Sequence, residues 1–198
     1  MALKAGVVAV QGDVSEHQRA IQRAGTANGH DVEAVEIRQS GVVPDCDLLL
    51  IPGGESTAIS RLLHREGIAA EINDHVAAGR PVLATCAGLI VLSRDSGDER
   101  VETLDLLDVT VERNAFGRQR DSFEGPLEVR GLSEPFPAVF IRAPVIDTVG
   151  DSVEMLAEFD GRPVAVREDN ILGTAFHPEL REDPRIHDLA FFQDGQGR

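Results

Sequence analysis

The feature that most constrains the fold of this chain is the regular alternation of short apolar runs with helical patterns through its first half. Runs rich in Val, Ile and Leu predict buried strands at residues 6–10, 32–37, 48–51 and 81–85. Between these runs, apolar residues recur at helical spacing, as they do at Ile59, Leu62 and Leu63. Strands that alternate with helices predict a parallel sheet with helices covering both of its faces.

Capping and turn residues indicate where these helices begin and end. Asp13, with Glu16 three residues later, has the pattern of a capping box at the start of the first helix, and Gly25 is expected to end that helix. The second helix follows a Pro-Gly-Gly sequence at residues 52–54, and Ser56 or Thr57 is expected to cap it.

Beyond Ser93 the pattern changes to short alternating stretches separated by turn residues. These stretches predict further strands, some of them antiparallel, at residues 108–112, 126–129, 139–141, 153–159, 164–167 and 171–176. Asp160-Gly161, between two of them, is typical of a hairpin. We therefore expect one α/β domain over residues 1–198, with a mostly parallel central sheet, helices on both faces and additional antiparallel strands. A frayed tail is expected from about residue 193 to 198.

The charge balance excludes whole classes of partner. The chain carries 19 Lys+Arg against 34 Asp+Glu, a formal net charge of −15, and Lys4 is its only lysine. Nucleic acids and anionic membranes are bound by clustered Lys and Arg, and the sequence contains no such cluster. The acidity has two explanations, ordinary solubility or adaptation to a salt-rich cytoplasm where ions screen self-repulsion, and we favour the second.

The cysteine content and the N-terminus predict a cytosolic protein. The chain has two cysteines, Cys46 and Cys86, too few for a disulfide framework, and its first residues lack the pattern of a signal peptide. No apolar run approaches the roughly 20 residues of a membrane span. We expect reduced thiols and no membrane association.

Cys86 lies where a catalytic nucleophile is often placed. It follows the predicted strand at residues 81–85 and precedes a predicted helix that starts with Ala87 and Gly88. A side chain on such a sharp turn is exposed at the carboxyl edge of the sheet, and the helix start supplies backbone N–H groups for an oxyanion. The competing interpretation is a small core residue, which free cysteines usually are. Cys46, between two aspartates, has no comparable setting and is taken as structural.

A thiol nucleophile needs a base, and of the six histidines His177 is the best placed. It directly follows the predicted strand at residues 171–176, and Pro178 prevents the strand from continuing. Glu179, two residues on, can orient the imidazole and stabilise its protonated form. The other histidines lie in helical or polar segments typical of packing or surface residues. Without the cysteine, this His-Pro-Glu sequence would be only weak evidence for a catalytic site.

The loop at residues 52–57 is the third candidate element. Its glycines allow a ligand to approach the backbone closely, but it lacks the Lys of a phosphate-binding loop. A second oxyanion donor for the cysteine is therefore a better use for it than nucleotide binding. The alternative is a tight turn and helix cap with no further role.

The motifs that carry a family resemblance are spread over nearly the whole chain: Val10-Gln11-Gly12-Asp13, Glu16-His17, Pro52–Thr57, Thr85–Ile90, Glu112–Gln119, Asp121–Glu124, Phe140–Pro144 and Phe176–Leu180. The cysteine turn and His-x-Glu are typical of class I glutamine amidotransferases as a whole. Together with the Arg-Asn-x-Phe-Gly-Arg-Gln and Phe-Ile-Arg-Ala-Pro blocks, they resemble the glutaminase subunit of pyridoxal 5′-phosphate synthase. Relatives often have glycine two residues before the nucleophile, where Ala84 stands here.

The resemblance implies hydrolysis of L-glutamine to glutamate and ammonia by a Cys-His-Glu triad, with no cofactor and no metal. Cys86 would attack the side-chain amide, His177 would transfer the proton to ammonia, and Glu179 would orient His177. Backbone N–H groups of Gly54 and Ala87 would hold the oxyanion. The positions that would line the glutamine site are Gly54, Glu55, Ser56, Arg113, Ile141 and Arg142. Arginine suits the substrate's α-carboxylate because a guanidinium binds it bidentately.

The resemblance also implies a partner. Ammonia would pass to a separate synthase subunit that builds pyridoxal 5′-phosphate from ribose 5-phosphate and glyceraldehyde 3-phosphate. The complex would commonly contain about twelve copies of each subunit. The segment that resembles the synthase-contacting part includes Gln11, Asp13, Glu16 and His17.

Two alternatives stay open from the sequence. One is a glutaminase that supplies another pathway, such as histidine or purine synthesis, or a related thiol hydrolase. The other is a noncatalytic relative that keeps the fold and only binds, against which the complete set Cys86, His177 and Glu179 argues.

Overall fold

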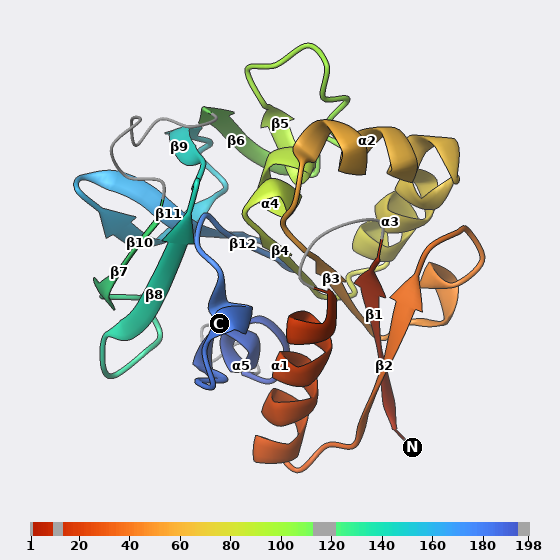
Figure 1. Ribbon diagram of the computed structural model, residues 1–198, viewed down its shortest axis with the longest axis horizontal. Helices are drawn as coiled ribbons and strands as arrows, with labels where there is room; N and C mark the ends of the chain where they lie inside the picture. The colour runs from red at the N-terminus through yellow and green to blue at the C-terminus, as the bar shows by residue number, and fades with distance from the viewer. Residues whose placement is uncertain (1, 10–13, 113–121, 194–198) are drawn as a thin grey trace.

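The protein is organised around a central twisted sheet, seen here in a computed structural model that describes residues 2–9, 14–112 and 122–193. Within these residues the sheet has seven strands in the order β10-β11-β12-β4-β3-β1-β2 (Figure 1). Its parallel part is formed by β1 (Leu3–Val8), β2 (Val32–Ile37), β3 (Leu48–Ile51), β4 (Val82–Thr85) and β12 (Ile171–Thr174). Two antiparallel strands, β11 (Arg162–Glu168) and β10 (Glu154–Phe159), extend it at one edge.

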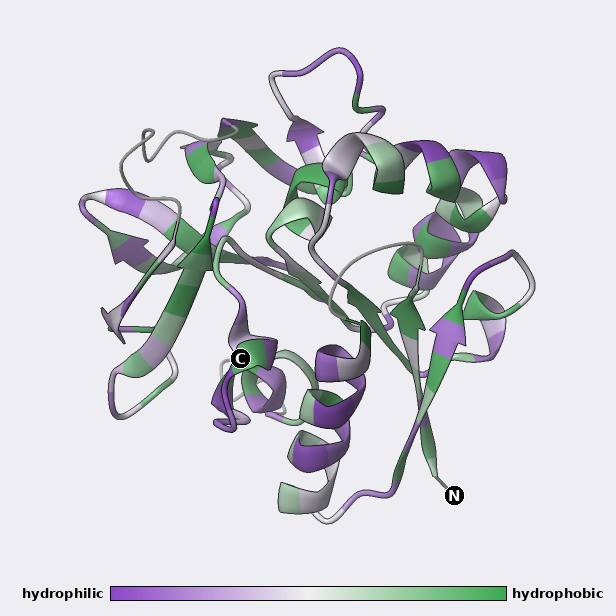
Figure 2. Cartoon of the chain, viewed as in Figure 1, coloured by the Kyte–Doolittle hydropathy of each residue, from purple (hydrophilic) through white to green (hydrophobic). Residues whose placement is uncertain are grey.

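Helices cover both faces of this sheet (Figure 1). One face carries α1 (Val14–Ala27) and α5 (Arg185–Phe191), and the other carries α2 (Ser56–Arg65), α3 (Ile68–Ala77) and α4 (Ala87–Leu92). Every residue of β3 and β4 is buried, and the middle of the sheet is correspondingly hydrophobic (Figure 2). Within the described ranges, no helix combines the length and the apolar character needed to cross a membrane.

Two smaller sheets and two short 3₁₀ turns complete the described structure. One sheet joins β5 (Ser93–Asp95), β6 (Leu107–Glu112) and β9 (Val145–Val149), and the other is the antiparallel pair β7 (Ser122–Leu127) and β8 (Phe136–Ile141). The turns are η1 (Val43–Asp45) and η2 (Pro178–Leu180). Phe123 stacks on Phe140 of β8 with 4.6 Å between ring centroids and lies 5.0 Å from Phe159 of β10. These rings tie the two-stranded sheet to the edge of the large one.

The expected fold class is confirmed: a mostly parallel sheet, helices on both faces and additional antiparallel strands. The predicted strands at residues 32–37 and 48–51 have the predicted bounds. The pattern did not predict β5, β9 or α5, and the strand expected at residues 171–176 ends at Thr174.

Two details of the helix ends were predicted wrongly. Gly25 does not end α1, which continues to Ala27. A Cβ at this buried position would overlap the Val32 side chain, so the glycine serves close packing between α1 and β2. The N-cap of α2 is Glu55 rather than Ser56 or Thr57, because the Glu55 carboxylate accepts hydrogen bonds from the N–H groups of Thr57 and Ala58. The proposed cap at Asp13 lies outside the described residues.

Candidate active site

Cys86 sits on the sharp turn between β4 and α4. Its backbone has φ 51° and ψ −110°, a conformation that a residue with a side chain rarely adopts. The turn is held by the N–H of Cys86, which donates to the Thr174 carbonyl on β12 at 2.8 Å. The predicted nucleophile turn is thus present in the structure, at the carboxyl edge of the parallel strands.

The turn depends on close packing of α4 against the end of β3. A Cβ at Gly88 would overlap the carbonyl oxygen of Ile51, so any larger residue there must push α4 away from the sheet. Since Cys86 immediately precedes α4, the position of its thiol depends on this contact.

His177 and Glu179 lie on the neighbouring turn, where β12 leads into η2. The His177 N–H donates to the Val139 carbonyl at 2.8 Å, and its ring Nδ1 lies 2.7 Å from Oε1 of Glu179. The Cys86 side chain also acts on the imidazole and raises its pKa. Both His177 and Glu179 are buried, with 5 % and 3 % of their surface exposed. The structure therefore brings together the three residues that the sequence selected from separate segments.

The electrostatics of this group favour an imidazolium between a carboxylate and a sulfur. Burial acts to lower the pKa of His177, but hydrogen bonds with Cys86 and Glu179 outweigh it and raise that pKa to about 10. Burial likewise acts to raise the pKa of Glu179, yet His17 and His177 hold it well below its usual value. Glu179 is therefore ionised, and it stabilises a proton on His177.

Gly53 brings the loop at residues 52–57 close to Cys86 and His177, a role that the sequence did not predict for it. A Cβ there would lie 3.0 Å from Cε1 of His177 and 3.2 Å from Cβ of Cys86. The missing side chain therefore leaves room between the loop and the side chains of Cys86 and His177. The Gly-Gly pair signalled a close approach, but the pattern could not show which glycine makes it.

The other predicted residues of this loop have mixed surroundings. Gly54 is exposed with φ 138°. The Glu55 carboxylate is occupied as the helix cap and also accepts from the Thr57 hydroxyl at 2.7 Å. The Ser56 side chain is buried, and its hydroxyl has no hydrogen-bond partner among the described residues.

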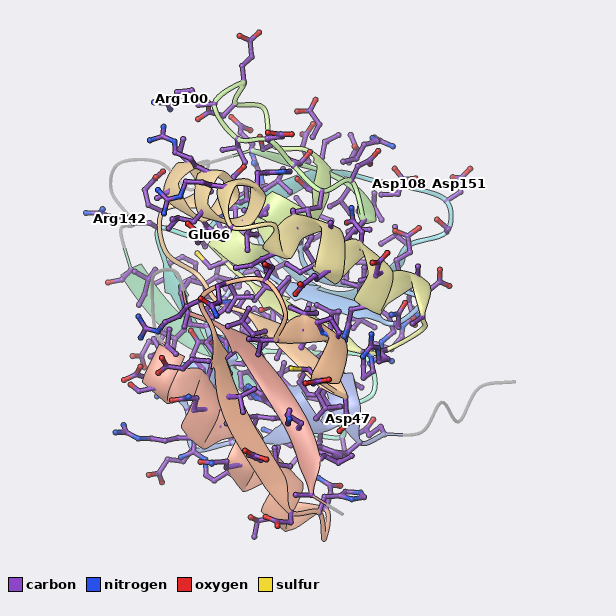
Figure 3. The ribbon with its side chains drawn as sticks, turned by 90° about the vertical axis from the view of Figure 1, so that its right-hand side faces the viewer. Asp47, Glu66, Arg100, Asp108, Arg142 and Asp151 are labelled. Carbon is purple, nitrogen blue, oxygen red and sulfur yellow. The ribbon has the colours of Figure 1, made fainter. Side chains whose placement is uncertain are left out.

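The end of β8 reaches the cysteine from the other side. The carbonyl oxygen of Ile141 lies 3.9 Å from Sγ of Cys86, and Ile141 is 39 % exposed. Arg142 follows with φ 43°, projects outward (Figure 3) and forms no ion pair with any residue in the described ranges. Its guanidinium is thus available beside the site. Arg113, the other predicted arginine, lies outside the described residues.

The segment predicted to contact a partner is described only in part. Gln11 and Asp13 lie outside the described residues, and Glu16 is half-buried with its carboxylate bonded to the Ser15 hydroxyl at 2.8 Å. His17 is fully buried and faces Glu179 instead of solvent. A surface contact through the His17 side chain is therefore not available in this structure.

Cys46 has the structural setting expected from its sequence. It is buried, its Sγ donates to the Val42 carbonyl at 3.3 Å, and burial raises its thiol pKa to about 11. Both cysteines are free thiols. No cluster of three or more His, Cys, Asp or Glu side chains suited to a metal ion occurs in the described ranges.

Comparison with known proteins gives consistent matches over almost the full length. The SNO glutamine amidotransferase family model matches residues 7–194. Pyridoxal 5′-phosphate synthase subunit PdxT of Haloarcula marismortui is 71% identical over 192 residues, covering 97% of this chain and 98% of that protein. The corresponding subunit of Methanothrix thermoacetophila is 54% identical, covering 93% and 96%.

A solved structure agrees with this assignment. A crystal structure described as a glutamine amidotransferase superposes with a TM-score of 0.86 at 44% identity, covering 94% of this chain and 96% of that one. The family model and the high identity over nearly the whole length lead to one conclusion. The chain belongs to the SNO glutamine amidotransferase family.

Proposed function

We propose that this protein is the glutaminase subunit of a pyridoxal 5′-phosphate synthase and that Cys86, His177 and Glu179 are its catalytic triad. One observation carries the proposal: a cysteine on a strained turn lies beside a histidine that a buried glutamate orients, within a member of a glutamine amidotransferase family. The relatives at 54–71% identity bear the name of this subunit.

The first half of the reaction forms a thioester. The Cys86 sulfur attacks the side-chain amide carbon of glutamine, and the C–N bond breaks. His177 gives its proton to the leaving ammonia. A histidine with a raised pKa beside an ionised glutamate is suited to this role. The products of this half are ammonia and a γ-glutamyl thioester on Cys86.

The second half releases glutamate. Water attacks the thioester carbonyl while His177 takes a proton from it, and the sulfur leaves to regenerate the resting enzyme. In both halves, the tetrahedral intermediate carries an oxyanion for which backbone N–H groups of Gly54 and Ala87 are our proposed donors. Gly54 belongs to the loop that approaches Cys86, and Ala87 is the first residue of α4.

We assign the glutamine site to residues on both sides of Cys86. The exposed Arg142 is our choice for the substrate's α-carboxylate, together with Arg113. Ile141 lies beside the thiol, and Gly54, Glu55 and Ser56 come from the opposite loop. Ser56 offers a buried hydroxyl without a partner among the described residues, which a bound polar group would satisfy.

Ammonia released at Cys86 would serve a synthase partner in the cytoplasm. Gln11, Asp13 and Glu16 are our candidates for residues that contact that subunit, in a complex of about twelve copies of each chain. The net charge of −15 fits a protein that works at high salt, where screening limits self-repulsion. A partner from the histidine or purine pathway is less well supported, because the relatives cited above are named for pyridoxal 5′-phosphate synthesis.

The test is glutamate release from glutamine by the purified protein, with and without its purified synthase subunit. We expect release that increases with the synthase and vanishes in Cys86→Ala, whereas Cys46→Ala keeps activity because its thiol is remote and structural. Full activity in Cys86→Ala would refute the triad. Activation only by a histidine- or purine-pathway synthase would refute the pathway.

A further inference from the structure

Glu179 contacts a second imidazole besides that of His177. Nε2 of His17, on the first turns of α1, lies 3.5 Å from the same Oε1 atom that His177 approaches at 2.7 Å. The His17 and Glu179 side chains have no exposed surface. The glutamate that orients the proposed base is thus held between two buried rings from different elements.

His17 also contacts the strand that leads to the nucleophile. Its Nε2 lies 3.2 Å from the hydroxyl oxygen of Thr85, the residue directly before Cys86. A bare ring lone pair facing the Glu179 carboxylate would be repelled, so we place the ring proton on Nε2, where it is shared between Glu179 and Thr85. One ring therefore links α1, the end of β4 and the turn that carries His177.

We propose that His17 is a positioning residue of the glutaminase: it holds the Glu179 carboxylate in place and keeps it in register with the Cys86 turn. The inference rests on the proposed function and goes beyond it, since the triad chemistry requires no fourth side chain.

The surroundings explain why Glu179 needs this second contact. Its Oε2 atom is buried and has no hydrogen-bond partner among the described residues, so the contacts to Oε1 are what restrain the carboxylate. The other titratable groups that act on Glu179 are His187 of α5, whose pKa is lowered by burial, and Glu16 of α1. Neither supplies a hydrogen bond to it among those described. Without His17, we expect the carboxylate to rotate and to stabilise the His177 proton less well.

The experiment compares His17→Leu with His17→Gln and His17→Asn in the complex with the synthase. Leu removes the donor, Gln places an amide N–H at about the reach of the lost Nε2, and Asn is too short to reach Glu179. We expect kcat to fall about 10–100-fold in Leu and Asn, the range seen when a group that orients a functional histidine is lost. KM should stay within about threefold, because His17 does not touch substrate, and Gln should recover most of kcat.

The matched control is His75→Leu on α3. His75 is equally buried, and among the described residues the one hydrogen-bond contact of its Nε2 is to a backbone carbonyl, that of Pro81 at 3.3 Å. It should lose stability as His17→Leu does, yet keep kcat. If His17→Leu fails to fold, the comparison of Gln with Asn decides, because both are polar and only Gln reaches Glu179.

A second readout is independent of glutamine turnover. The rate of Cys86 alkylation by iodoacetamide, measured against pH in a Cys46→Ala background, follows the thiolate that the His177 proton stabilises. In His17→Leu we expect the midpoint of this alkylation profile to move to higher pH by about one unit, because the positive charge on His177 that favours the thiolate is weakened. His75→Leu should leave the midpoint unchanged.

The outcomes separate the two proposals. If the wild-type complex releases no glutamate, the proposed function fails, and the alkylation profile alone decides on His17. A His17→Leu protein with wild-type kcat and an unmoved alkylation midpoint would overturn the positioning role. The positioning role would also be overturned if the losses of kcat in His17→Leu, His17→Gln and His17→Asn were only proportional to their losses of stability.

Discussion

At the scale of single residues, the site is a short chain of buried polar groups that runs from the Cys86 sulfur through His177 to Glu179. A charge on either His177 or Glu179 alone would be unfavourable, because burial disfavours the charged form of each side chain. Their mutual hydrogen bonds reverse both effects, so the imidazolium and the carboxylate exist as a pair. A change to one member should therefore disturb the others.

Glu179→Gln tests that coupling. The amide keeps the shape of the side chain and removes the charge that stabilises the His177 proton, so we expect kcat to fall by about 10²–10⁴-fold, as for other triads whose third member loses its charge. Steady-state glutaminase kinetics with the synthase provide the measurement. Glu182→Gln, an exposed change three residues later, is the control and should be neutral. Equal activity of the two variants would show that Glu179 does not act through His177.

At the scale of elements, the approach of α4 to β3 positions Cys86, our proposed nucleophile. We expect Gly88→Ala to destabilise the protein by about 1–3 kcal/mol, a usual cost of overpacking, because its Cβ would overlap the Ile51 carbonyl. It should also lower kcat, since Cys86 moves with α4. Urea unfolding and glutaminase kinetics report the two effects.

Gly125→Ala is the control for this substitution. A Cβ at Gly125, in β7, meets no atom within 4 Å, so we expect almost no change in stability. If Gly88→Ala proved as stable and active as Gly125→Ala, the packing of α4 would not determine the position of Cys86.

The packing of α5 against α1 predicts a sensitivity to acid. His187 is fully buried, neither ring nitrogen has a hydrogen-bond partner among the described residues, and burial lowers its pKa to about 3. Below pH 6.5 the unfolded chain takes up a proton at this position and the folded chain does not. The folded state should therefore lose about 1.4 kcal/mol per pH unit as the pH falls from 6.5 toward 3.

His187→Leu should remove that loss. We expect the free energy of unfolding by urea to drop between pH 7.5 and 5.5 by about 1.4 kcal/mol less in the variant than in the wild type. Identical pH dependence in the two proteins would mean that His187 is protonated in the folded state.

The sequence could predict features that neighbouring residues determine, but it could not predict contacts between segments far apart in the chain. The strand end before Cys86 was predictable, because a hydrophobic run marks it locally. The strand before His177 ends at Thr174, two residues earlier than its hydrophobic run indicates. The contact of His17 with Glu179 was not predictable, since it joins α1 to a turn near the other end of the chain. Glu55 as helix cap was missed because Ser56 and Thr57 are also good caps and stand beside it. The seven-residue α5 is too short for a clear periodic pattern.

At the scale of the whole molecule, the excess of acidic residues is the dominant property. Several of these side chains project from the periphery, among them Asp108 and Asp151 (Figure 3). Self-repulsion from a net charge of −15 destabilises the folded state at low ionic strength. Salt screens it, as the Debye length falls from about 30 Å at 0.01 M to about 3 Å at 1 M.

We therefore expect the urea midpoint of unfolding to rise as KCl is increased from about 0.01 to 1 M. A variant that combines Glu99→Gln, Glu128→Gln and Asp151→Asn loses three exposed negative charges and should show a smaller rise. Parallel salt responses in the two proteins would assign the effect to general salting-out rather than to charge, and a midpoint indifferent to KCl would contradict the salt adaptation itself.

The central claim is that Cys86 forms a covalent intermediate with the γ-acyl group of glutamine. The most direct measurement is acid quenching of the complex with its synthase during turnover, followed by mass spectrometry of the peptides that contain Cys86 and Cys46. We predict a glutamyl adduct on the Cys86 peptide, none on the Cys46 peptide and none in Cys86→Ala. Turnover of glutamine with no adduct on Cys86, or with an adduct that persists in Cys86→Ala, would contradict this account.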